Sequence, residues 1–125
     1  MIYAIGHDIV ENKRISEVLN RYGSRALKRI LTDAEIEIFN QRDDKVKFLA
    51  KRFAAKEAFA KACGTGLRAP VLLSNISVIN DSLGRPYFVL APELEKWIKD
   101  RGIKNFHLTI SDEKSLSSAI VIFEK

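Results

Sequence analysis

The chain has 125 residues, 46% of them hydrophobic and 30% charged, with a formal net charge of +5 and a single cysteine. This length corresponds to one domain over residues 1–125, and the apolar content excludes a disordered chain. One thiol, Cys63, cannot form an internal disulfide or a Cys-rich zinc site, which indicates a reducing compartment. The start does not resemble a signal peptide, and no apolar run approaches the roughly 20 residues of a membrane span. We therefore expect a cytoplasmic protein with no membrane partner, whose positive charge favours anionic partners.

The first predicted element is a strand over residues 2–10 (IYAIGHDIV), an apolar run typical of a strand buried on both faces. Alternation places Ala4, Gly6 and Asp8 on one face, so small neighbours leave space beside the Asp8 carboxylate. An ionised carboxylate in an apolar strand is costly unless it is paired or bound to a metal. The alternative is that Asp8 caps a turn at the end of the strand.

Residues 12–30 predict a helix with a weak point at Gly23, and a capping box at Thr32 and Glu35 predicts a second helix to about Gln41. The first helix carries basic residues at spacings that place them along one side. This side is either a surface for an anionic partner or an ordinary solvated face. Its basic residues are Arg14, Arg21, Arg25, Lys28 and Arg29.

Residues 45–63 are the strongest predicted helix, which should end at Gly64. Phe53, Glu57 and Lys61 are four residues apart and share one face. Taken alone, Glu57 and Lys61 would form a weak surface salt bridge. Taken with Asp8, Glu57 would supply the second carboxylate of a magnesium site completed by water and substrate phosphate. The glycine-rich loop after the helix offers backbone N–H groups to phosphate.

The second half of the chain predicts mostly strands, over residues 74–80, 87–91, 105–111 and 117–123, with a short helix over 92–101. Early helices followed by late strands predict an α+β domain with helices packed on a mainly antiparallel sheet. Three single residues have ordinary structural interpretations: Cys63 as a buried thiol, Trp97 as a core or interface residue, and His107 as a strand residue without a catalytic role.

Two blocks of the sequence resemble the two-part signature of the 4′-phosphopantetheinyl transferases: residues 5–8 (IGHD) and, about fifty residues later, residues 53–61 (FAAKEAFAK). The second block matches the family pattern at every defined position. His7 replaces the usual aliphatic residue, but alternation turns it away from Asp8. Further similarity, up to the terminal HLTISDE segment, covers essentially the whole chain and indicates the short subtype, the holo-acyl-carrier-protein synthases.

The resemblance implies the phosphopantetheinyl transferase fold and a magnesium-dependent enzyme of fatty acid biosynthesis. Such an enzyme transfers 4′-phosphopantetheine from coenzyme A to a serine of an acyl carrier protein and releases 3′,5′-ADP. Asp8 and Glu57 would be catalytic metal ligands, and Lys61 would contact the phosphates and assist proton transfer. By the same resemblance, the coenzyme would be bound by Arg52, Phe53, Lys61, Gly64, Gly66, Gly84, Arg85, Pro86 and Ser111.

The resemblance also implies a homotrimer with its sites between subunits, Ser111 and Asp112 being supplied by the neighbouring subunit. The acidic carrier protein would dock on Arg14, Arg21 and Arg25. The general base stays open between a metal-bound water and Glu35.

Two other functions were weighed. A nucleic-acid-binding module would account for the charge of +5 and the basic helix. However, the sequence has no aromatic-interleaved RNA motif, zinc knuckle or recognisable helix-turn-helix, so we expect no nucleic-acid partner. A coenzyme-binding scaffold without activity is the second alternative, and the complete block at residues 53–61 argues against it.

Overall fold

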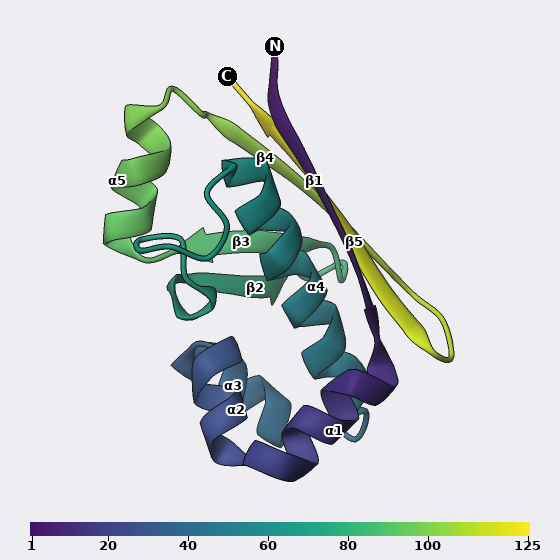
Figure 1. The fold of residues 1–125 in the computed structure, drawn as a ribbon. Helices are drawn as coiled ribbons and strands as arrows, with labels where there is room; N and C mark the ends of the chain where they lie inside the picture. The colour runs from purple at the N-terminus through teal and green to yellow at the C-terminus, as the bar shows by residue number, and fades with distance from the viewer.

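A long helix, α4 (Lys45–Cys63), lies against a three-stranded antiparallel sheet in the computed structural model, which describes residues 1–125 (Figure 1). The sheet has the order β1-β5-β4. Its strands are β1 (Ile2–Glu11), β4 (Asn105–Asp112) and β5 (Leu116–Glu124). The first and last strands of the chain are therefore neighbours, with Asp8 opposite Ala119.

The other two strands form a separate antiparallel hairpin, β2 (Ile76–Asn80) and β3 (Pro86–Leu90), which contacts α4 and β4. A short 3-10 turn, η1 (Leu73–Asn75), precedes β2 where the sequence predicted the start of a strand. Helix α5 (Pro92–Asp100) begins at a proline, as predicted, and joins the hairpin to β4. The predicted α+β class is confirmed, with its antiparallel strands divided between two sheets.

Three short helices form the lower end of the molecule in Figure 1. They are α1 (Asn12–Tyr22), α2 (Ser24–Ile30) and α3 (Asp33–Asn40). Gly23 has a φ of 54° and a ψ of −126°, which no helix accommodates, so the predicted weak point divides one basic helix into two. The capping box is also confirmed: the Thr32 hydroxyl accepts from the Glu35 backbone, and the Glu35 side chain accepts from the Thr32 backbone.

The prediction that β1 is buried on both faces is wrong. Its inner face, which includes Gly6 and Val10, is buried against α4, whereas Ile5 is 59% and Ile9 is 57% exposed on the outer face. The core lies between the sheet, α4 and the hairpin, and it is organised around Phe59, whose ring contacts those of Phe88 and Phe123. No helix of the structure has both the length and the apolar character that crossing a membrane requires.

Strand β1 crosses α4 in unusually close contact at Gly6. A Cβ atom at this position would lie 1.8 Å from the backbone oxygen of Ala58 and 2.8 Å from the backbone nitrogen of Ala62. Only glycine lets the two backbones approach this closely. The position of this crossing determines where along α4 the Asp8 side chain lies, because Asp8 is the next inward residue of β1.

Candidate active site

Asp8, Glu57 and Lys61 meet where β1 crosses α4. The Lys61 ammonium donates to Asp8 Oδ1 at 3.1 Å and to the backbone oxygen of His7 at 2.9 Å. The Asp8 side chain is 16% exposed, so it remains open to a ligand. Lys61 pairs with Asp8 across the fold, and the Glu57–Lys61 salt bridge that the helix alone suggested does not form. Asp8 does not cap a turn; it lies within β1.

The Glu57 carboxylate has too little positive charge nearby to offset its burial and the negative charge of Asp8. Burial raises the pKa of Glu57, the negative charge of Asp8 raises it further, and Lys61 opposes both effects. A carboxylate whose pKa is raised by burial and by a second carboxylate favours a bound cation, because the cation offsets both effects. The side chains that the sequence predicted as a pair therefore form an electronegative site with one ammonium at its edge.

The donor set fits magnesium. No three His, Cys, Asp or Glu side chains come together anywhere in the chain, so this site offers Asp8 and Glu57 alone. A structural zinc site would need four protein ligands and a catalytic one three. Magnesium is commonly held by one or two carboxylates, while water and substrate phosphate complete its octahedron. Asp8 and Glu57 could hold such an ion, with Lys61 beside it for the charge of a phosphate.

The raised pKa of Glu57 makes a prediction about stability. A carboxyl whose folded-state pKa is raised stabilises the fold below its unfolded pKa, and this contribution is lost as the pH rises through the folded pKa. Metal-free Glu57→Gln should therefore unfold at a higher urea concentration than wild type at pH 7, and the difference should close as the pH falls towards 4.5, the ordinary value. Glu57 is half-exposed, so solvent screening keeps the gain small. Equal urea midpoints for Glu57→Gln and wild type at every pH, measured with EDTA present, would contradict this prediction.

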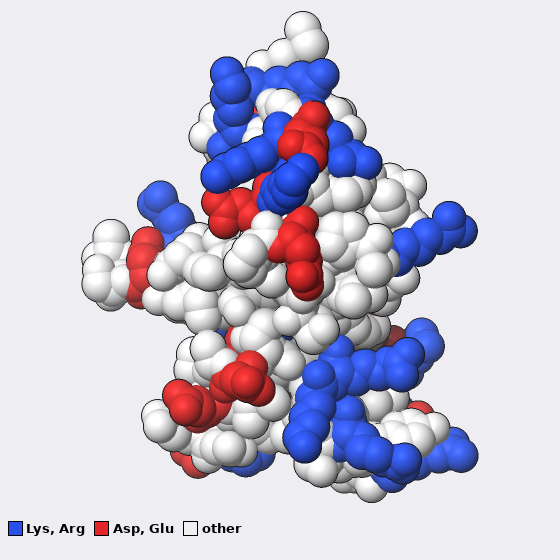
Figure 2. Space-filling model, turned by 90° about the vertical axis from the view of Figure 1, so that its left-hand side faces the viewer, with Lys and Arg blue, Asp and Glu red and all other residues white.

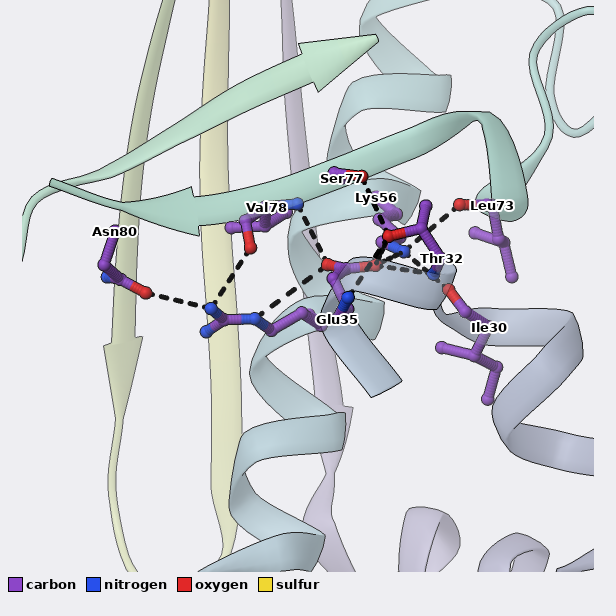
Figure 3. Close-up of polar contacts among 9 residues, drawn as sticks. Ile30, Thr32, Glu35, Lys56, Leu73, Ser77, Val78 and Asn80 are labelled. Carbon is purple, nitrogen blue, oxygen red and sulfur yellow. Dashed lines mark hydrogen bonds and ion pairs between the residues drawn. The ribbon is translucent and has the colours of Figure 1, made fainter. Parts of the chain in front are cut away.

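Arg52 and Glu35 lie away from this site, in a buried polar network (Figure 3). The Arg52 side chain is 6% exposed and donates to the backbone oxygen of Val78 at 3.1 Å and to Asn80 Oδ1 at 2.9 Å. Glu35 is fully buried and ion-paired with Lys56. A general base must reach the substrate proton, so the open alternative of Glu35 as the base is excluded. No sequence pattern indicated that either residue is internal.

The predicted glycine positions lie in turns. Gly64 ends α4 in the left-handed conformation, with a φ of 78°, and Gly66 follows in the loop with a φ of 66°. Gly84 has a φ of 86° in the turn between β2 and β3. Arg85 is exposed in the same turn, and its backbone N–H donates to Asp81 Oδ1. Pro86 begins β3, and Phe53 is half-buried on α4.

Known proteins resemble this chain in sequence and in fold. A family model described as the 4′-phosphopantetheinyl transferase superfamily matches residues 4–116. The chain belongs to this superfamily. It is 52% identical to the holo-[acyl-carrier-protein] synthase of Nitrosomonas europaea, over the full length of both chains.

Solved structures of relatives have the same fold. The holo-[acyl-carrier-protein] synthase of Neisseria meningitidis superposes with a TM-score of 0.97, at 48% identity and with both chains fully covered. The Bacillus anthracis synthase, in complex with CoA (3′,5′-ADP), has a TM-score of 0.82 at 35% identity and covers 98% of this chain and 96% of its own. The Helicobacter pylori synthase, in complex with coenzyme A, has a TM-score of 0.84 at 27% identity and covers 96% and 99%.

In this phosphopantetheinyl transferase, one predicted site residue is separated from the others. Ser111 lies on β4, and β5 separates β4 from β1. Asp8 and Ile110 are both opposite Ala119 on the inner face of the sheet, so Ser111 lies on the outer face. Ser111 therefore cannot join Asp8 within one chain. Its neighbour Asp112 is ion-paired with Lys47 at 3.3 Å.

The basic side chains predicted for docking gather at the lower end of the molecule, where α1 and α2 lie (Figure 2). Arg21 and Arg25 both lie against the Tyr22 ring, with guanidinium carbons 5.4 and 5.6 Å from its centre. No sequence pattern predicted the groove between these helices, although Val18 and Tyr22 share a helix face by their spacing. The groove is lined by Val18, Tyr22, Arg25, Ala26, Arg29 and Ile30.

Proposed function

We propose that this protein transfers 4′-phosphopantetheine from coenzyme A to a serine of an acyl carrier protein and releases 3′,5′-ADP. The observation that carries the proposal is the meeting of Asp8, Glu57 and Lys61 at the crossing of β1 and α4. It is supported by relatives that are named for this activity and were solved with the coenzyme. We further propose a role in fatty acid biosynthesis in the cytoplasm, where the free thiol of Cys63 would stay reduced.

Each site residue has a distinct part in the transfer. The serine oxygen attacks the phosphorus that carries pantetheine while its hydroxyl proton passes to water; a new O–P bond forms, and the P–O bond to 3′,5′-ADP breaks. Asp8 and Glu57 would hold a magnesium ion, which neutralises charge on the pyrophosphate when bound. Lys61 would exchange its contact with Asp8 for one with a phosphate oxygen, because both are anionic acceptors at the same edge of the site.

Two turns would receive the rest of the coenzyme. The loop at Gly64 and Gly66 would offer backbone N–H groups, with Phe53 on the preceding helix. The turn at Gly84 and Arg85 would provide a second contact with the coenzyme, together with Pro86 at the end of the turn. Arg52 would support this turn from inside, because it binds Asn80, whose side-chain amide donates to the Gly84 carbonyl at 2.9 Å.

The decisive experiment is intact mass spectrometry of an acyl carrier protein incubated with this protein, coenzyme A and magnesium. We expect the carrier to become heavier by one phosphopantetheine group, and we expect EDTA to abolish the shift. Several carrier proteins should be tried, with a carrier whose serine is replaced by alanine as control. An unshifted mass for all of them would overturn the proposed function.

We also propose that the working enzyme is a homotrimer whose sites lie between subunits. The outer face of the three-stranded sheet exposes Ile5, Ile9 and Ile120, the last at 40%, and monomers rarely leave such a contiguous apolar face uncovered. Ser111 lies on the same face, so association would place it at the boundary between subunits. Light scattering should show a trimer, and Ile5→Glu with Ile9→Glu should give a folded, inactive monomer. A fully active wild-type monomer would contradict this assembly.

The carrier protein would dock on α1 and α2, through Arg14, Arg21 and Arg25. Arg25 lines the groove together with Val18 and Tyr22, and Arg21 lies against the Tyr22 ring, so an acidic helix with an apolar edge would be complementary. Charges of this kind mainly raise the association rate, and their effect weakens with salt.

A further inference from the structure

Three charged side chains are buried inside the protein: Glu35, Lys56 and Arg52 (Figure 3). Removing charges from water is costly, and a buried ion pair seldom improves stability over apolar side chains of similar size. None of the three contacts Asp8 or Lys61. Stability alone therefore gives a weak reason for their burial, and their contacts suggest another role.

Lys56 fastens the end of α2 to α4. Its ammonium donates to the backbone oxygen of Ile30 at 2.6 Å, to Glu35 Oε1, and to the backbone oxygen of Leu73 at 3.1 Å, which uses all three of its protons. Ile30 is the last residue of α2, so this carbonyl has no partner within its own helix. A cation at this end also matches the helix dipole. Lys56 is the chain neighbour of Glu57, so one turn of α4 carries both the anchor and a predicted metal ligand.

Glu35 extends the same attachment to two further elements. Its Oε1 accepts from the Thr32 backbone N–H at 2.9 Å, which fixes the start of α3. Its Oε2 accepts from the Val78 backbone N–H at 2.9 Å, which fixes β2. Together Glu35 and Lys56 hold α2, α3 and β2 at set positions around α4.

Arg52, one helical turn before Lys56, makes a different connection. Its guanidinium stacks over Phe48 at 4.2 Å and binds the Val78 carbonyl and Asn80, and Asn80 in turn holds Gly84. Arg52 thus reaches the turn between β2 and β3 and makes no contact with α2. The two cations of one helix support two different surfaces.

We propose that Glu35 and Lys56 are positioning residues, which fix the carrier-docking helices α1 and α2 relative to Glu57. The inference rests on the proposed function, because it takes α1 and α2 as the docking surface. The carrier serine must arrive within reacting distance of a phosphorus held beside Glu57 on α4, and small misplacements are costly in such reactions. Arg52 would instead position the turn between β2 and β3, which is proposed to contact the coenzyme.

The test compares two variants in steady-state kinetics with both substrates varied. Glu35→Gln/Lys56→Met removes both members of the pair; Arg52 then loses the Glu35 charge 4.0 Å from its Nε but keeps its hydrogen bonds to Val78 and Asn80. Its KM for the carrier should rise about tenfold, while its KM for coenzyme A should change by less than about twofold. Arg52→Met, which alters the same helix at similar burial, should show the opposite pattern. Binding of the apo-carrier, measured directly by calorimetry, should weaken in the double variant only.

The outcomes separate positioning from simple destabilisation. Equal changes in both KM values in both variants would mean that the network only stabilises the fold, and would overturn the proposal. If the double variant does not fold, Lys56→Arg replaces it: this change keeps the charge but cannot place three donors at one point, and a wild-type carrier KM would then overturn the proposal. A wild-type enzyme that leaves the carrier mass unchanged would instead refute the proposed function, before any variant is compared.

Discussion

Alanine at Asp8 or at Glu57 should reduce transfer of phosphopantetheine by at least about a thousandfold, because either change leaves one carboxylate to hold the metal. Neither change should unfold the protein. Removing Glu57 relieves the repulsion that raises its pKa, and Asp8 lies at the partly open edge of the core. The loss should therefore appear in turnover and not in the amount of folded enzyme.

Intact mass spectrometry of the carrier measures the transfer, and circular dichroism measures the fold of each variant. Glu93→Ala is a suitable control, since it removes an exposed carboxylate from the first turn of α5. Its turnover should equal that of wild type. Near-normal turnover in Asp8→Ala or Glu57→Ala would refute the metal assignment.

Gly6→Ala should have the largest effect on stability. The added Cβ atom would lie 1.8 Å from a backbone oxygen of α4, and a backbone in the middle of a packed helix cannot move aside as a flexible side chain can. We expect a loss of about 3 kcal/mol or more in the free energy of unfolding, at the upper end of single substitutions. Any molecules that fold must hold β1 further from α4, which moves Asp8 away from Glu57.

Urea denaturation measures the loss, and His7→Ala is the matched control. His7 is the next residue of β1, and its exposed side chain leaves the helix untouched; only its backbone oxygen contacts Lys61. His7→Ala should unfold close to the wild-type midpoint. A wild-type midpoint for Gly6→Ala would show that the two backbones are not in close contact.

Local sequence signals predicted most of the elements. Helix α4 has the predicted bounds. It ends where predicted because Gly64 adopts the left-handed conformation that stops a helix. Thr32 and Glu35 marked the start of α3 through interactions three residues apart. The burial of β1 was predicted wrongly, because Ile5 and Ile9 are as apolar as core residues although they lie on the outer face. Alternation identifies the two faces of a strand but not what covers each.

The site was only partly predictable. Alternation in β1 and the four-residue spacing in α4 gave the faces of Asp8 and Glu57, which the structure brings together. The ion pair between Lys61 and Asp8 depends on which part of α4 the strand β1 crosses, and no local sequence pattern encodes that position. The burial of Arg52 was also missed, because a charged residue among alanines reads as a surface position until its distant partners are known.

The pairing of β1 with β5 has a consequence for how the enzyme is made. Asp8 leaves the ribosome about a hundred residues before Leu116–Glu124, the strand with which β1 pairs. Until those residues are synthesised, β1 has no partner on its β5 side, and its apolar side chains remain a target for chaperones or other nascent chains. Contacts between the two ends of a chain also slow folding, because a long loop must close first. We therefore expect the active site to be assembled only after β5 has left the ribosome and paired with β1.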